Sequence, residues 1–339
     1  MSRGTAVAPP RAVPGRARRG EEQQAARIAR SDILFAGLGL AMWGGTAVKC
    51  APYFTPSDLA QCGAGLVAML VISVAWPLLW PAGYQRWRVP AIAFLQLFLF
   101  ALPFNFSTAV FDVLAPHHGT GRLAWVYNVF QLFMSIRVAL LLFTSVGWRL
   151  PLHTQILVQA LKVMMLAVFG TRPYCQSKLL SSPEMVDIFA KIHSALAVTG
   201  MPLMPLTPAS SIIPHDDFSK RAAVLLLSWL ILGWLVPALL LLPEAESARS
   251  ASQQPRRARE GGSSQPQPAP VPRARTAGEL VEAALSALLP PPGRPATGAR
   301  RSELPGGLMV ALRWWILVQV LWGACCVAAP LFSSADEAP

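Results

Sequence analysis

Two apolar segments joined by a short turn constrain this chain more than any other feature. Residues 123–147 and 152–170 are nearly continuous apolar runs, and Pro151 lies in the turn between them. At 1.5 Å of rise per residue, a helix of about 20 residues crosses the roughly 30 Å hydrocarbon core of a bilayer. Arg137 lies inside the first run and Lys162 inside the second. The sequence therefore predicts a transmembrane hairpin with two interior cations, which are costly enough to need a physical explanation.

The composition extends this interpretation to the whole chain. Of the 339 residues, 53% are hydrophobic and 14% are charged, whereas about 25% are charged in typical soluble domains. The predicted fold class is all-α, a polytopic helical transmembrane bundle in an integral membrane protein. Seven spans are favoured, at about 32–49, 58–80, 89–115, 123–147, 152–170, 222–243 and 308–332. A further apolar segment, 185–206, makes an eighth span if it crosses the bilayer.

The remaining segments are polar. Residues 1–31 contain seven Arg and are predicted to be a disordered tail, with an organelle transit peptide as the alternative. Residues 244–307, rich in Pro, Arg, Gln and Ser, are predicted to be a disordered loop. Within this loop, a capping-box pattern at Thr276 predicts a short helix at 277–289, a candidate docking site for a protein partner or the membrane surface. Residues 333–339 are predicted to be an acidic tail.

The distribution of arginine favours seven spans over eight. The net charge is +12, and most of it lies in the N-terminal tail and the long loop. With the tail in the cytoplasm, seven spans place the nine Arg of residues 244–307 in the cytoplasm too, whereas eight spans place them outside. The arginines therefore indicate topology control and contact with a bilayer surface, and they do not indicate a nucleic-acid partner.

Polar side chains within the predicted spans form a candidate binding site inside the membrane. Gln155, Gln159 and Lys162 follow helical spacing and share one face of the fifth span. Arg137 is predicted at a height similar to that of Lys162, so an anionic solute or lipid is a candidate ligand. Asp187 is a candidate counter-ion if residues 185–206 enter the membrane. The candidate binding residues are Arg137, Lys162, Gln131, Gln155, Gln159, Asp187 and Lys191.

Three functions remain open at this stage. An anion transporter or channel predicts that Arg137, Lys162 and the glutamines line a cavity, and a structural or assembly protein predicts a packed bundle. A membrane enzyme, which is the least favoured, predicts that Asp112, His117 and His118 converge. The chain lacks the HExxH, GxSxG, P-loop and GxGxxG motifs, so the sequence indicates no catalytic residue, metal site or cofactor. The five cysteines are expected to be buried apolar residues, with a disulfide such as Cys50–Cys175 as the less favoured alternative.

Overall fold

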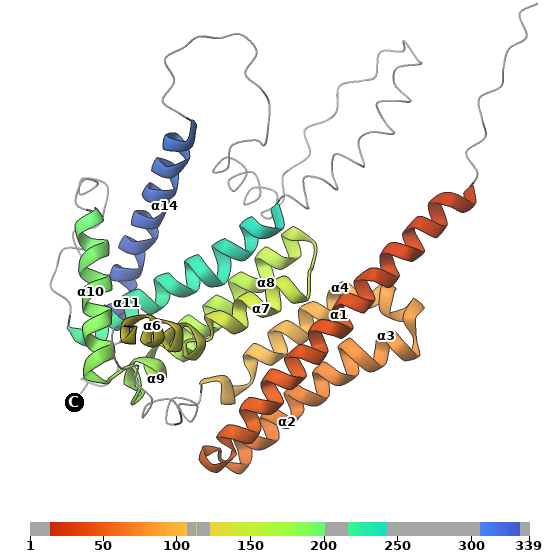
Figure 1. Cartoon of the computed structure of the whole chain (residues 1–339), viewed down its shortest axis with the longest axis horizontal. Coiled ribbons are helices and arrows are strands. Elements are labelled where there is room, and N and C mark those ends of the chain that lie inside the picture. The colour runs from red at the N-terminus through yellow and green to blue at the C-terminus, as the bar shows by residue number, and fades with distance from the viewer. Residues whose placement is uncertain (1–13, 107–112, 114–122, 201–215, 243–305, 333–339) are drawn as a thin grey trace, which may run out of the picture.

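The chain folds into a helical bundle (Figure 1). The computed structural model describes residues 14–106, 113, 123–200, 216–242 and 306–332, and the regular elements within these ranges are all helices. The predicted all-α class agrees with this finding. Several predicted features lie outside the described residues: most of the loop 244–307 with its short helix 277–289, the acidic tail, Asp112, His117 and His118.

The helices of the described residues divide between the two halves of the chain. The first half contains α1 (Pro14–Cys50), η1 (Ala51–Tyr53), α2 (Pro56–Leu70), η2 (Val71–Ala75), α3 (Trp76–Leu79), α4 (Pro81–Ala101) and η3 (Pro103–Phe106). The second half contains α6 (Ala124–Ser135), α7 (Val138–Gly147), α8 (Leu152–Met165), η4 (Leu166–Gly170), α9 (Thr171–Gln176), α10 (Pro183–Gly200), α11 (Asp217–Ser228), η7 (Trp229–Leu235), α14 (Gly306–Ala328) and η8 (Ala329–Phe332). Three of these elements, η2, η4 and η7, are π-helical.

Five helical stretches in the described chain are long and apolar enough to cross a membrane, which indicates an integral membrane protein. They are Ala26–Tyr53, Pro56–Leu79, Leu152–Gln176, Asp217–Leu242 and Ala311–Phe332. A sixth span exists if Ala124–Phe133 and Val138–Gly147 form one bent crossing, since the two helices diverge by 60°. Neither α4 nor α10 belongs to this set, so the seven-span and eight-span arrangements both remain predictions.

Two helices begin earlier than the sequence predicts. The first helix starts at Pro14 instead of residue 32, because the Arg, Glu, Gln and Ala residues of the predicted tail are good helix formers. The helix predicted at 89–115 corresponds to α4, which starts at Pro81, where a proline fits the first helical position. Its end differs as well: Pro103 forces extended backbone on Leu102 (ψ 121°), so the helix stops where a kink was expected.

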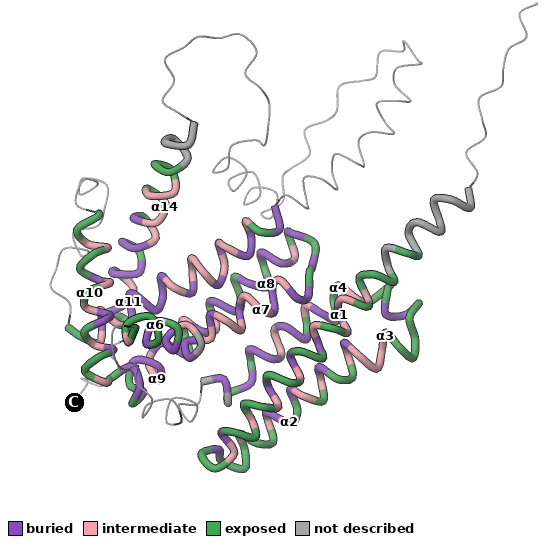
Figure 2. The backbone as a smooth tube through the Cα atoms, viewed as in Figure 1, coloured by how far each residue is buried: buried purple, intermediate pink, exposed green. Residues whose placement is uncertain are grey.

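Burial is greatest where η7 runs alongside α7 and α8 (Figure 2). Leu141, Leu166 and Trp229 are fully buried there, whereas α1 and α2 expose many apolar side chains on their outer faces, as helices in lipid do. η7 approaches α7 closely at Gly233, where an added Cβ atom would overlap Leu141 Cδ1 unless that side chain shifted. The largest hydrophobic cluster therefore lies in the second half of the chain, and a second cluster is formed mainly by α1, α2 and α4.

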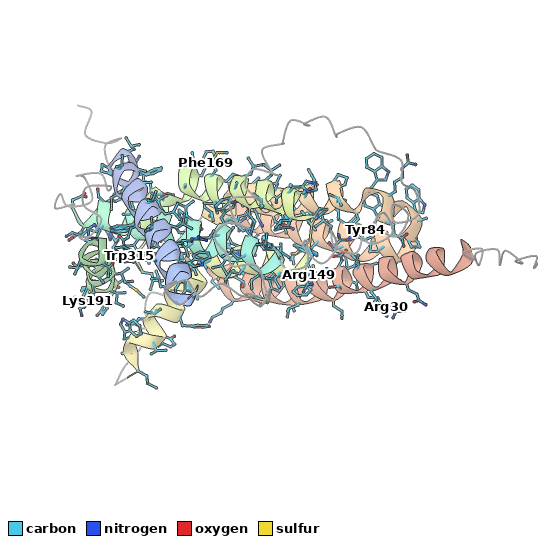
Figure 3. All side chains as sticks on the ribbon, turned by 90° about the horizontal axis from the view of Figure 1, so that it is seen from above. Arg30, Tyr84, Arg149, Phe169, Lys191 and Trp315 are labelled. Carbon is cyan, nitrogen blue, oxygen red and sulfur yellow. The ribbon has the colours of Figure 1, made fainter. Side chains whose placement is uncertain are left out.

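A buried ion pair fastens α1 to α4. The Nε atom of Arg88 donates to Asp32 Oδ2 at 2.6 Å, and a second guanidinium nitrogen donates to Oδ1 at 2.8 Å. The hydroxyl of Tyr84, labelled in Figure 3, donates to the same carboxylate at 2.8 Å. Burial and the neighbouring Asp32 carboxylate raise the pKa of Tyr84, which keeps its hydroxyl a hydrogen-bond donor. Sequence patterning could not reveal this contact, since Asp32 and Arg88 lie 56 positions apart.

Removing the arginine of this pair should destabilise the protein. Arg88→Leu leaves the carboxylate of Asp32, which is 1% exposed, without its cation, and breaking a buried pair in this way costs about 3 kcal/mol or more. As a control, Lys191→Gln breaks a pair whose side chains are 71% and 59% exposed, and it should cost less than about 1 kcal/mol. Thermal unfolding of both variants in detergent micelles measures the difference. Equal small shifts would contradict the stabilising role of the Asp32–Arg88 pair.

The side of the membrane reached by residues 244–307 tests the seven-span prediction. Because seven spans keep this segment in the cytoplasm, glycosylation acceptor sites inserted into it should stay unmodified. Protease added to intact cells should cleave it only after the membrane is permeabilised. Modification of the inserted sites in intact membranes would rule out the seven-span arrangement.

Candidate functional site

The predicted fourth span is not one continuous helix. α6 ends at Ser135, α7 begins at Val138, and the two helices diverge by 60°. Between them Arg137 adopts left-handed backbone (φ 65°), the one positive φ of a non-glycine residue in the described chain, which costs about 1–2 kcal/mol for an L-residue. No Gly or Pro marks this break, so the apolar pattern gave no signal for it.

Arg137 lies near one end of the bundle, not at its middle. Its Nε atom donates to the Asn105 carbonyl at 3.4 Å, and the Tyr174 hydroxyl donates to the same oxygen at 2.6 Å. Asn105 belongs to η3, beyond the end of α4. The expectation of equal heights for the two cations therefore does not hold: Lys162 contacts Thr144, which is two turns, or about 10 Å, further along α7 than Arg137.

Lys162 is completely buried and is held by neutral groups. Its Nζ atom donates to Gln96 Oε1 and to Thr144 Oγ1, both at 2.9 Å, and lies 5.0 Å from the centroid of the Phe100 ring. No described carboxylate forms an ion pair with it. Gln96 in turn donates to the carbonyl of Trp148 at 3.0 Å. These bonds join α8 to α4 and α7 through buried polar groups.

Gln159 extends this polar network toward η7. Its Nε2 atom donates to the Leu141 carbonyl at 3.2 Å, to the Gly233 carbonyl at 3.0 Å and to the hydroxyl of Ser145. Gly233 is part of a π-helical segment, and a π-helical turn shifts the backbone pairing so that a carbonyl becomes available to a side chain. The structure therefore brings together Lys162 and Gln159, as the shared helix face predicts.

The other predicted site residues do not join the Lys162 network. Gln155 lies one turn before Gln159 and is 1% exposed, and neither atom of its amide has a hydrogen-bond partner among the described residues. Gln131 is buried on α6. Asp187 and Lys191 pair with each other at 2.5 Å on the exposed face of α10, where Figure 3 shows Lys191 at the periphery of the molecule. Among the described contacts, Asp187 is therefore not the counter-ion of Lys162.

A cavity with a volume of about 130 Å³ lies between α1, α2, α4 and α7. One water needs about 10–15 Å³ by the same measure, so a small solute fits. Its walls are mainly apolar and aromatic, with few polar groups; the lining includes Met42, Trp43, Phe54, Met69, Leu99, Leu140 and Phe143 together with Thr46, Asn105, Arg137, Thr144 and Trp148. No acidic side chain is among the lining residues. Lys162 does not line the cavity, but its amine donates a hydrogen bond to Thr144, which does line it.

Polar atoms at both ends of the cavity have no partner in the described chain. Asn105 Oδ1 and Trp148 Nε1 are buried, and neither forms a hydrogen bond there. Buried polar groups are normally satisfied by protein, water or ligand, so these atoms mark positions where a bound molecule or water gains a contact. Asn105 and Trp148 were not predicted as site residues, because one follows a predicted kink and the other lies in a predicted turn.

No family model, curated protein or solved structure matches this chain. The described cysteines, all five of the chain, are buried and free, as expected, and the less favoured Cys50–Cys175 disulfide is absent. No cluster of His, Cys, Asp or Glu in the described part of the chain has the arrangement of a metal site. The function must therefore be inferred from the cavity and the polar network themselves.

A double-mutant cycle should show that Gln96 and Lys162 act as a pair. Gln96→Leu removes one of the two acceptors of the buried amine and should cost about 1–3 kcal/mol. In Lys162→Met the amine is already absent, so adding Gln96→Leu should cost markedly less. Thermal unfolding of the parent, the two single variants and the double variant gives the coupling energy. Additive effects would show that the Lys162–Gln96 bond contributes no stability.

Proposed function

We propose that this protein is a multi-pass membrane transporter that binds an anionic solute in the cavity beside Arg137. One observation supports this most directly: Arg137, at the break between α6 and α7, lines a largely apolar cavity that has no acidic side chain among its described lining residues. An arginine offers five N–H donors in a planar fork that suits carboxylate and phosphate groups. The cavity therefore has the charge and donor chemistry of an anion site.

The broken helix supports transport over a purely structural role. Discontinuous helices in transporters place backbone N–H groups and irregular turns at substrate sites inside the membrane. Here α7 begins directly after Arg137, and Ala139 and Leu140 of its first turn line the cavity. The positive end of the α7 dipole thus lies beside the same cavity as the guanidinium, and both favour negative charge.

The structural alternative rests on the Lys162 network. Because that lysine is fully buried and held by Gln96 and Thr144, its arrangement suits a residue that joins helices. We assign Lys162 to assembly of the bundle and Arg137 to ligand binding. The enzyme alternative depends on Asp112, His117 and His118, which lie outside the described residues, and no observation supports it.

Flux measurements in proteoliposomes test the proposal. Phosphate, lactate and octanoate serve as probes, and at least one should enter faster than into protein-free vesicles. Arg137→Gln should slow that flux about tenfold or more, since a charge-assisted hydrogen bond contributes about 1.5–3 kcal/mol. Glutamine, like arginine, tolerates left-handed backbone poorly, so the substitution leaves the backbone cost nearly unchanged and removes the charge.

Two further variants make this test specific. Arg149→Gln removes an exposed arginine from the turn between α7 and α8 and should leave flux unchanged. Arg137→Lys keeps the positive charge and should retain more flux than Arg137→Gln. Absence of flux for all three probes, or equal flux in the Arg137→Gln variant and the parent, would refute transport through this site.

A further inference from the structure

We infer that the ligand of the cavity is a single-chain anionic amphiphile, with its head group at Arg137 and its hydrocarbon chain alongside α7. This inference rests on the proposed anion-binding function and specifies its substrate class. A small inorganic anion would use the guanidinium alone. The apolar walls, which make up most of the cavity, would then contribute nothing to binding, although burial of apolar ligand surface is a main source of affinity.

The shape of the cavity sets the orientation of such a ligand. Its lining residues on α7 run from Arg137 to Trp148, a distance of about 16 Å along a helix. On α1 they run from Gly39 to Ala47, about 12 Å. Gly39 lies beside Phe143, which is six residues or about 9 Å along α7 from Arg137, so a group at Gly39 meets the ligand chain and not its head. The cavity therefore extends alongside two helices, which suits one extended chain.

The two ends of this cavity differ in charge: the guanidinium of Arg137 lies at one end, and the uncharged indole N–H of Trp148 lies at the other. Near Arg137 it is lined by Asn105 of η3 and by Phe54 of the turn between α1 and α2, both at the ends of helices. The buried Asn105 Oδ1 lacks a partner in the described chain and accepts from a water or hydroxyl group of the ligand head. Between the ends, Met69, Leu140 and other apolar side chains form the wall. This polarity matches a bilayer lipid, whose head lies at the surface and whose chain points inward.

Glycine 39 offers a way to block the chain while leaving the head-group site intact. A Cβ atom at Gly39 would lie 3.4 Å from Met69 Sδ and 3.5 Å from Phe143 Cε1, both of them wall residues. A leucine there extends into the space of the chain. Gly37, on the same helix, has no atom within 4 Å of a Cβ position and is exposed. Gly37→Leu is therefore a matched control for Gly39→Leu.

Binding to the full-length protein in nanodiscs tests the inference with three probes. Octanoate carries both charge and chain, acetate the charge alone and 1-octanol the chain alone. By isothermal titration, octanoate should bind saturably, with at least about tenfold higher affinity than either control, because each buried methylene adds to affinity. Gly39→Leu should weaken octanoate binding about tenfold or more, Gly37→Leu should not, and Arg137→Gln should weaken octanoate binding but leave 1-octanol binding unchanged.

The outcomes separate the inference from the proposed function. If acetate binds as tightly as octanoate and Gly39→Leu has no effect, the amphiphile is refuted while the anion site stands. If Arg137→Gln alters binding of no probe, the anion site is refuted as well. Should Gly39→Leu fail to fold, judged by gel filtration, Ala139→Leu fills the cavity from α7 instead. Native mass spectrometry distinguishes the two sources of the ligand. If the parent retains a lipid from the cell membrane and the Arg137→Gln variant does not, the ligand is a bilayer lipid. If the parent is purified empty and takes up octanoate, the ligand is a free fatty acid.

Discussion

The hydrogen-bonded amine of Lys162 is the constraint on which the middle of this bundle depends. Inside apolar surroundings a polar group must find partners within the protein, or its burial costs several kcal/mol. Gln96 on α4 and Thr144 on α7 accept from the same nitrogen on α8, so three helices are held in one register. Gln159 repeats the arrangement one turn earlier and brings in η7 through the Gly233 carbonyl.

This polar anchoring permits an irregular feature nearby. The left-handed backbone of Arg137 costs free energy, and it persists because packing on both sides holds the break between α6 and α7 in place. The bend places the start of α7 beside η3, so Arg137 lies near the ends of helices, where it lines the cavity with Asn105. Apolar side chains of α1, α2 and α7 enclose the remaining space. The two cations of the predicted hairpin thus have different surroundings: one is enclosed by neutral acceptors, and the other borders a cavity.

The candidate site was partly predictable. Helical spacing alone placed Gln159 and Lys162 on one buried face, because the 3.6-residue period depends only on local backbone geometry. Their partners Gln96 and Thr144 were not predicted, since contacts between helices depend on how the helices pack. The pairing of Asp187 with Lys191 on the surface follows from their spacing of four positions. Whether α10, which carries this pair, lies beside Lys162 depends on how the helices pack, and the spacing of residues does not determine that.

The sequence by itself determined the class of the protein and most of its helices. Long apolar blocks leave no other low-energy solution in a bilayer than helices with internally paired backbones, and Pro151 marks a turn by its own chemistry. Only the tertiary structure decided where Arg137 and Lys162 lie relative to each other. That outcome depends on a helix break without Gly or Pro, and on contacts such as Asp32 with Arg88 that join residues far apart in the chain. Such contacts carry no periodic signature, so the cavity became visible only once the helices were packed.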